Sequence, residues 1–379
     1  MPSLSNYPNA RPSLLLDFAS SGLVDPRVQV TRATTATRIN ARGLIENVAA
    51  NVPRINYDPF TGECLGLLNE VSRTNEIIQS EFATGIAGIP SSGVTATNFP
   101  GFAGGVSVQL NSAGAYVYKS VATVVGTSYY FGFLLLMDDG GDATLGVDFS
   151  VVFTGGVVPA TVKKLGGGLH LVQTTQVVSG TNTFFGVVKY ANQSARGFKV
   201  TAYDRQAGGF PTSYIPTTTA AVTRAAENII IGGASFLEIF NQEQGTLYVE
   251  GIQDGNYGGW FAGLSSGTAS DRTGVYMSGT QVRSVAYLGA VAQTNLSVNA
   301  PLTGQSKKAA FAMQKDNFAV SVNGSVAVTG AAGSVPAFTQ MSIGNAPWGA
   351  TESFCGCIKR IAYYPTRLSN AQLQALTAP

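Results

Sequence analysis

The sequence has little charge, a single histidine and few cysteines. Charged residues make up 12% of the 379 residues and sum to a formal net charge of +2, so the chain lacks the basic excess of proteins that bind nucleic acids. His170 alternates with two leucines and is expected at a surface or sheet edge, without a catalytic partner. Three cysteines cannot build a disulfide framework, and Cys355 and Cys357 lack a second pair of zinc ligands. We therefore expect no metal and no cofactor.

Long hydrophobic runs are also missing. The longest, Tyr129 to Met137, is about nine residues, whereas a membrane-spanning helix needs roughly 20. The first 13 residues are polar and proline-rich, and Asp17 interrupts the short apolar run that follows, so no secretory leader is expected. The sequence predicts a chain that assembles reduced in a cytosol and does not insert into a membrane.

What the sequence does contain is typical of β structure. It has 45 glycines and 16 prolines, with abundant Val, Thr, Ser, Tyr and Phe. Candidate strands recur about every ten residues in the ranges 106–203 and 235–364, and no helical crossover segments lie between them. The pattern predicts an all-β fold with one sandwich at 79–228 and a second at 229–379.

A few local predictions are specific. Residues 56–66 are expected to form a hairpin, because Asp-Pro and Thr-Gly favour turns. Residues 235–241 are interpreted as a strand. The only expected helix follows Ser369, which is predicted to be its N-cap, with Gln372 at the capping-box position.

The N-terminal segment, residues 1–78, differs from the rest in its charges. It holds seven arginines, no lysine and seven acidic residues. Guanidinium groups suit protein interfaces, because their planar fork binds carboxylates and carbonyls in pairs. With few apolar residues, the segment is predicted to be an extended anchor that orders against another protein; the alternative is a small salt-bridged domain without a partner. The predicted docking residues are Arg32, Arg38, Arg42, Arg54, Tyr57 and Arg73.

Short sequence motifs, here called phrases, that resemble motifs of known proteins occur along most of the chain. In the N-terminal segment they are Leu14–Phe18, Thr31–Thr37, Pro53–Pro59 and Gly66–Asn75. Further phrases are Pro211–Pro216, Val222–Arg224, Phe318–Gly324 and Ile358–Tyr364. The first set resembles the N-terminal signature of tailed-bacteriophage head spike, head fibre or tail appendage proteins, and the phrases at 211–224 resemble the end of that family's first, carbohydrate-module-like sandwich. The last two phrases resemble concanavalin A-like, laminin G-like or jelly-roll sandwiches.

The resemblance implies a place in a virus particle. It implies a virion structural protein assembled in the host cytoplasm, docked by its N-terminus to capsid, portal, collar or tail proteins. It also implies a homo-oligomer, commonly a trimer. The resemblance says little about the ligand, and our hypothesis is that the displayed sandwiches contact host-surface glycan. Two alternatives stay open, namely a glycan depolymerase of the particle and a decoration protein that only stabilises the capsid.

Motifs for catalysis and for metal binding are incomplete. Glucanases of the concanavalin A-like class place an Asp between two glutamates on one strand, but Phe240 stands at that position between Glu238 and Glu243. Ser265 lies in a Gly-x-Ser-x-Gly pattern, without the strand-to-helix turn and the later histidine of a serine hydrolase. The acidic turn 138–142 lacks the remaining EF-hand ligands. We expect no catalytic residues, no metal site and no enzyme.

Two loops combine aromatic rings with amide or carboxylate groups, as sugar-binding sites do. The candidate carbohydrate-binding residues are Asp254, Asn256, Tyr257 and Trp260 in the first loop, and Asn345 and Trp348 in the second. The alternative is that either tryptophan belongs to the core, which the neighbouring Phe261 favours for Trp260.

Overall fold

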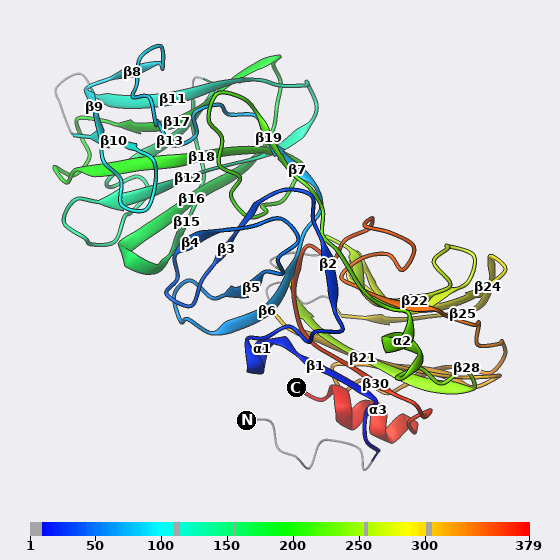
Figure 1. Ribbon diagram of the computed structural model, residues 1–379. Coiled ribbons are helices and arrows are strands. Elements are labelled where there is room, and N and C mark those ends of the chain that lie inside the picture. The colour runs from blue at the N-terminus through cyan, green and yellow to red at the C-terminus, as the bar shows by residue number, and fades with distance from the viewer. Residues whose placement is uncertain (1–9, 110–113, 155, 254–256, 301–304) are drawn as a thin grey trace.

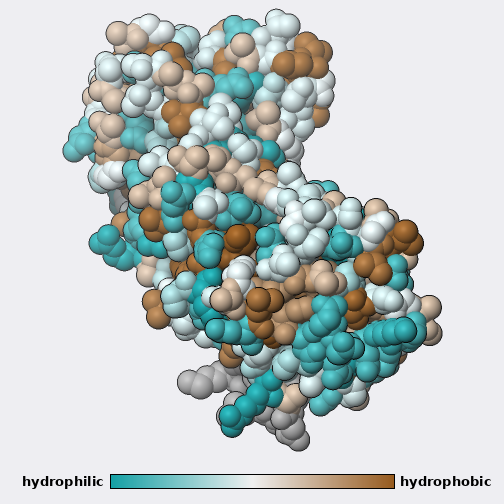
Figure 2. All heavy atoms as spheres, turned by 45° about the vertical axis from the view of Figure 1, so that its right-hand side comes forward, coloured by the Kyte–Doolittle hydropathy of each residue, from teal (hydrophilic) through white to brown (hydrophobic). Residues whose placement is uncertain are grey.

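The computed structural model describes residues 10–109, 114–154, 156–253, 257–300 and 305–379. The chain is almost entirely antiparallel β structure, which confirms the predicted all-β fold. Figure 1 shows two β-sandwiches, one green and cyan, the other mainly yellow and orange. In Figure 2 the two lobes meet at a narrower waist, and hydrophobic residues form separate patches on the visible face. Within the described ranges, no helix is long and apolar enough to span a membrane.

The first sandwich packs a six-stranded sheet on a five-stranded sheet. The larger sheet has the order β15 (Thr161–Lys164), β16 (Leu169–Val177), β12 (Ser128–Met137), β18 (Phe198–Ala207), β10 (Gly105–Val108) and β9 (Val94–Thr97). The smaller has the order β14 (Gly156–Val158), β13 (Ser150–Phe153), β17 (Asn182–Lys189), β11 (Ala115–Ala122) and β8 (Ser91–Ser92). Aromatic rings fill the space between them, with the Phe131 and Phe185 centroids 5.0 Å apart.

The second sandwich is larger and has sheets of eight and seven strands. The eight-stranded sheet runs β28 (Val328–Gly330), β27 (Phe318–Val322), β26 (Lys307–Gln314), β21 (Gln244–Ile252), β30 (Gly356–Tyr364), β6 (Cys64–Asn69) and β5 (Ile55–Tyr57), with β1 (Leu14–Asp17) also paired to β30. The seven-stranded sheet runs β2 (Gln29–Thr31), β20 (Asn228–Gly232), β29 (Gln340–Ile343), β22 (Gly259–Ser265), β23 (Arg272–Ser278), β24 (Gln281–Leu288) and β25 (Val291–Asn299).

The structure places the N-terminal segment differently from the predicted extended anchor. Four of its strands complete the second sandwich: β1, β5 and β6 extend one sheet, and β2 pairs with β20 in the other. Leu14, Leu16 and Leu67 are buried in the shared core. These few apolar residues build no core alone, but they cover β-sheet surface that would otherwise face water. The segment is therefore part of the second sandwich and not a separate domain.

The first sandwich is an insertion into the second. The chain enters it through β7 (Arg73–Asn75) and leaves through β19 (Val222–Arg224), and these two strands pair antiparallel. Figure 1 shows them together between the two sandwiches. The predicted domain boundary at 228/229 therefore lies at the start of β20, where the chain returns to the second sandwich. The predicted boundary at 78/79 lies between the entry strand β7 and the rest of the inserted sandwich, which belong together.

A hairpin of the N-terminal segment also contacts the first sandwich. It consists of β3 (Ala36–Ile39) and β4 (Ile45–Val48), and Leu44 at its turn packs with Leu165 of the first sandwich. Gly43 has a φ of +74°, and a Cβ there would come within 2.2 Å of the Pro59 carbonyl oxygen and 2.8 Å of Gly166. Glycine is required at this position both for its backbone conformation and for the close approach.

The local predictions have mixed outcomes. The hairpin expected at 56–66 is confirmed by the pairing of β5 with β6. The C-terminal helix α3 (Asn370–Thr377) has Ser369 as N-cap with both bonds of the capping box. The strand predicted at 235–241 is wrong, because the helix α2 (Ala234–Leu237) begins there. Phe236 and Phe240 stack at 5.1 Å on the same side of this turn, a helical spacing. A second short helix, α1 (Phe18–Ser21), was not predicted.

Candidate functional site

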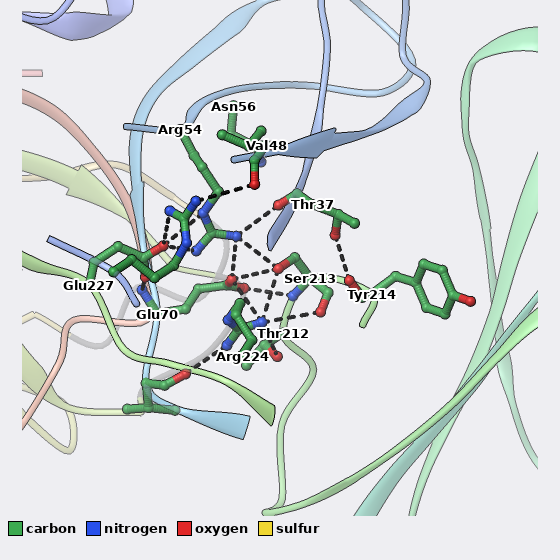
Figure 3. A network of polar contacts seen from close by, with 12 residues as sticks. Thr37, Val48, Arg54, Asn56, Glu70, Thr212, Ser213, Tyr214, Arg224 and Glu227 are labelled. Atoms are coloured by element: carbon green, nitrogen blue, oxygen red, sulfur yellow. Dashed lines mark hydrogen bonds and ion pairs between the residues drawn. The ribbon is translucent and has the colours of Figure 1, made fainter. Parts of the chain in front are cut away.

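Arg54 lies at the centre of a polar network where the two sandwiches meet (Figure 3). Its side chain is fully buried, and its Nε donates to Glu227 Oε1 at 2.8 Å. Its Nη1 lies 2.8 Å from Glu70 Oε2 and donates to the Thr37 carbonyl and to Ser213 Oγ, both at 2.8 Å. The guanidinium thus binds two carboxylates, one backbone carbonyl and one hydroxyl, as its planar arrangement of donors allows.

Two further buried arginines complete the network. Arg32 Nη1 donates to Glu227 Oε1 at 3.1 Å, and its Nη2 donates to the Ala49 carbonyl at 2.6 Å. Arg224 Nη1 lies 3.1 Å from Glu70 Oε2. Both side chains are fully buried, so each guanidinium has exchanged water for partners of its own chain.

The electrostatics of Glu70 show how the network is balanced. Burial alone would raise the pKa of this carboxyl, but Arg224 and Arg54, together with hydrogen bonds from Ser213, outweigh burial and lower the pKa to about 2. The Ser213 amide and hydroxyl donate to Glu70 at 2.6 and 2.7 Å. Removing one member of such a buried set leaves an uncompensated charge in a medium of low polarity.

The network joins segments that are far apart in the sequence. It contains members of five of the recognisable phrases, at 31–37, 53–59, 66–75, 211–216 and 222–224. These phrases lie in the N-terminal segment, at the exit of the first sandwich and at the start of the second. Residues from these five segments therefore hold the two sandwiches together.

The predicted docking role of the arginines needs correction. Arg32 and Arg54 are buried and bonded within the chain, so they offer no surface to another protein. Arg38 is half-buried and pairs with Glu46 at 2.5 Å, whereas Arg42 is exposed at the turn of the β3–β4 hairpin. The equal numbers of arginines and acidic residues in residues 1–78 indicated that these charges pair within the chain, as in the alternative of a small salt-bridged domain. The main partner, Glu227, lies outside that segment.

The last two predicted docking residues lie between the sandwiches. Tyr57 is half-buried and lines a cavity of about 330 Å³ beside the network, as do Tyr130 of the first sandwich and Cys357 of the second. Asp204 also lines the cavity. Its Oδ2 accepts a hydrogen bond from Gln206, and no partner for its Oδ1 exists among the described residues. Burial raises the pKa of Asp204 to about 7, so this carboxyl can donate a proton near neutral pH.

The predicted carbohydrate-binding residues lie partly in one place. Trp260 is buried on the outer face of the seven-stranded sheet, with Tyr276 stacked on it at 4.8 Å and Trp348 edge-on at 5.6 Å. Trp348 is half-buried. Asn345 is fully buried and donates to the Glu227 carbonyl at 2.8 Å, so it supports the loop from inside. Asp254 and Asn256 lie outside the described residues.

A groove of about 460 Å³ continues from this face toward the first sandwich. Tyr257, which is 37% exposed, stacks on Phe210 at 4.3 Å, and the Arg73 guanidinium lies 4.6 Å from the Phe210 ring. Arg73 thus lines the groove and is not free for docking by itself. Tyr276 and Phe210 were not among the predicted residues, and they are brought together by segments more than 60 residues apart, which no local pattern reveals.

His170, the acidic turn 138–142 and Ser265 each form hydrogen bonds within the chain. His170 is buried, contrary to the expected surface position, and its Nε2 accepts a hydrogen bond from the Ala143 amide at 3.3 Å. Asp139 of the acidic turn binds Arg196 Nε at 2.6 Å. Among the described residues no group of three metal-ligand side chains is present. Ser265 Oγ donates to the Pro347 carbonyl.

No protein-family model and no curated protein matches the chain. Among solved structures, the IT-sialidase CBM40 of Ruminococcus gnavus bound to α2,3 sialyllactose has 18% identity and a TM-score of 0.32, over 36% of this chain and 84% of that one. The NanB sialidase of Streptococcus pneumoniae has 16% identity and a TM-score of 0.33, over 40% and 26%. The receptor binding domain of botulinum neurotoxin mosaic serotype C/D has 7% identity and a TM-score of 0.31, over 39% and 38%. At these values the similarities do not indicate a function.

Proposed function

We propose that the protein is a non-enzymatic structural component of a bacteriophage particle, a head or tail spike or fibre. In this proposal it presents its two sandwiches as one rigid body and adheres to glycan on the host surface. Assembly in several copies, commonly three, is part of the same proposal.

The observation that carries the proposal is the position of the recognisable phrases. Five of them supply the buried network around Arg54, Glu70 and Glu227. The chain therefore resembles phage appendage proteins at the residues that fix its two-sandwich architecture, which a chance similarity of surface loops would not do. Fixed sandwiches suit a part that must transmit contact from a host surface to a particle.

Docking to the particle needs a different surface from the one expected. Arg42 is exposed on the β3–β4 hairpin, with no acidic partner within ion-pair distance among the described residues. We place the docking contact at this hairpin turn, since a free guanidinium there can bind carboxylates or carbonyls of a capsid or tail protein.

Purified particles test the proposal. Particles separated by density from the lysate of the producing cells should contain the full-length chain by peptide mass spectrometry, and an antibody against it should label their head or tail in immunogold micrographs. The proposal is overturned if the chain is found only in the soluble fraction.

A further inference from the structure

The outer face of the seven-stranded sheet carries arginines next to aromatic rings. Across the strands, Tyr276 of β23 is paired with Trp260 of β22 on one side and with Arg283 of β24 on the other. Residues directly opposite on neighbouring strands share a face, so Arg283 lies beside the Tyr276 ring. Two rows further along the same face, the Arg272 guanidinium lies 3.7 Å from the Tyr287 ring centroid.

A loop brings another ring onto the same face. The Arg272 guanidinium also lies 5.1 Å from the Trp348 ring. Pro347 reaches the sheet over Gly263, where a Cβ would come within 2.9 Å of its Cγ. Gly263 thus leaves room for the loop, and the loop places Trp348 between Trp260 and Arg272.

These groups form a continuous strip with the groove described above. We call it the aromatic strip, and it consists of Phe210, Tyr257, Tyr276, Trp348 and Tyr287 with Arg73, Arg272 and Arg283. Its rings are half-buried or exposed, so each has a surface open to solvent. An extended row of rings fits several units of a polymer better than one small molecule.

The charge of the strip is positive and partly uncompensated. Among the described residues, none of its three arginines has a carboxylate within ion-pair distance. Two carboxylates lie nearby and keep their charges: Glu352 accepts from Trp260 Nε1 at 2.8 Å, and Asp271 accepts from the Gly289 amide at 2.7 Å. Three guanidinium groups against two carboxylates leave the strip with a net positive charge.

We propose that the aromatic strip binds an acidic polysaccharide whose sugars carry carboxylates. The C–H faces of sugars pack on aromatic rings, and a carboxylate can accept paired, charge-assisted bonds from a guanidinium. A nucleic acid is disfavoured, because the stretch 259–299 holds two arginines and no lysine, too few cations to follow a phosphate backbone. The inference names the ligand class of the proposed host adhesion and rests on it for its biological role only.

Calorimetric titration of the purified full-length chain tests this ligand class. The probes are oligomers of polygalacturonate, hyaluronan and alginate, with fully methyl-esterified polygalacturonate as the matched neutral polymer. We expect polyuronate binding, and an affinity at least about tenfold lower for the ester, the equivalent of one lost charge-assisted bond. Equal binding of the ester, equal binding of single-stranded DNA, or no binding of any polyuronate at millimolar concentration would each overturn the proposal.

Variants locate the binding. Arg283→Gln and Tyr276→Ser should each lower the affinity for the bound polyuronate about tenfold, whereas Arg283→Lys should lose less, because it keeps the charge. Arg11→Gln is the matched control, since Arg11 is exposed just before β1, which belongs to the opposite sheet. An unchanged far-UV circular dichroism spectrum shows that a variant is folded; tryptophan fluorescence is unsuitable, because Tyr276 stacks on Trp260. Affinity that is lost equally in the Arg11 variant, or retained in both strip variants, contradicts the proposed location.

The titration and the particle analysis can fail separately. A chain that binds polyuronate but is missing from particles refutes the virion role alone. A chain that is present in particles but binds no polyuronate refutes the acidic-glycan strip alone.

Discussion

Arg54 and Glu227 are 173 residues apart in the sequence, yet their side chains form a buried ion pair of 2.5 Å. The pair connects the N-terminal segment to the beginning of β20, on either side of the inserted first sandwich. Because Glu227 also binds Arg32, one carboxylate satisfies two buried guanidinium groups. The stability of the whole chain should therefore depend on this residue.

Glu227→Gln should destabilise the protein strongly. The substitution leaves Arg54 and Arg32 buried without their shared carboxylate, a change that typically costs about 3–5 kcal/mol. Urea unfolding measures the loss. Glu243→Gln is the control, because Glu243 is exposed and its loss should cost no more than about 0.5 kcal/mol. Equal stability of the two variants would show that the network contributes nothing.

Acid should weaken the network through Glu70. Its pKa is about 2 in the folded chain, against an ordinary value of 4.5, so its ionised form stabilises the fold above pH 4.5. That contribution is lost as the pH falls from 4.5 toward 2. We expect the free energy of unfolding to fall more steeply over this range for the wild type than for Glu70→Gln. Parallel curves would contradict the assignment.

Gly43→Ala should separate the β3–β4 hairpin from the first sandwich. A Cβ at this position meets the Pro59 carbonyl and Gly166, in addition to the strain of a positive φ. Gly85→Ala is a matched control, because Gly85 also has a positive φ but open space around its Cβ position. The control should lose about 1–2 kcal/mol and Gly43→Ala clearly more, measured by thermal unfolding. Equal losses would mean that the close approach is unimportant.

Removal of residues 1–78 should prevent correct folding. The truncation takes β1, β2, β5 and β6 from both sheets of the second sandwich and exposes the core that they cover. We expect an aggregated or partly unfolded product by size-exclusion chromatography and circular dichroism. The sequence alone predicts the opposite, an extended anchor outside both sandwiches, so a soluble, folded truncation would support that interpretation.

Local patterns predicted the strands well, and non-local pairing is what they could not reveal. The long strand β12 lies in the range 106–203 where strands were predicted, and the capping residues of α3 were identified from their spacing alone. By contrast, Leu14 pairs with Tyr363, and nothing near either residue indicates the other. The run at 235–241 has apolar residues that fit either a helix or a strand, and packing of Phe236 into the core decides for the helix.

The same distinction applies to the candidate site. Trp348 and Tyr257 were identified because aromatic residues in glycine-rich loops are visible in sequence. Tyr276 and Arg283 were missed, since they lie within ordinary strands and become neighbours only through strand register. Arg32 and Arg54 were correctly singled out as unusual, but their partners Glu70 and Glu227 are defined by the tertiary fold.

Comparison of two unfolding curves tests most directly whether the two sandwiches form one locked unit. Both tryptophans, Trp260 and Trp348, lie in the second sandwich, so their fluorescence reports on that part, whereas far-UV circular dichroism reports on the strands of both. We predict that the two signals follow a single coincident transition in urea. Loss of fluorescence at a concentration where about half of the β signal persists would contradict the account.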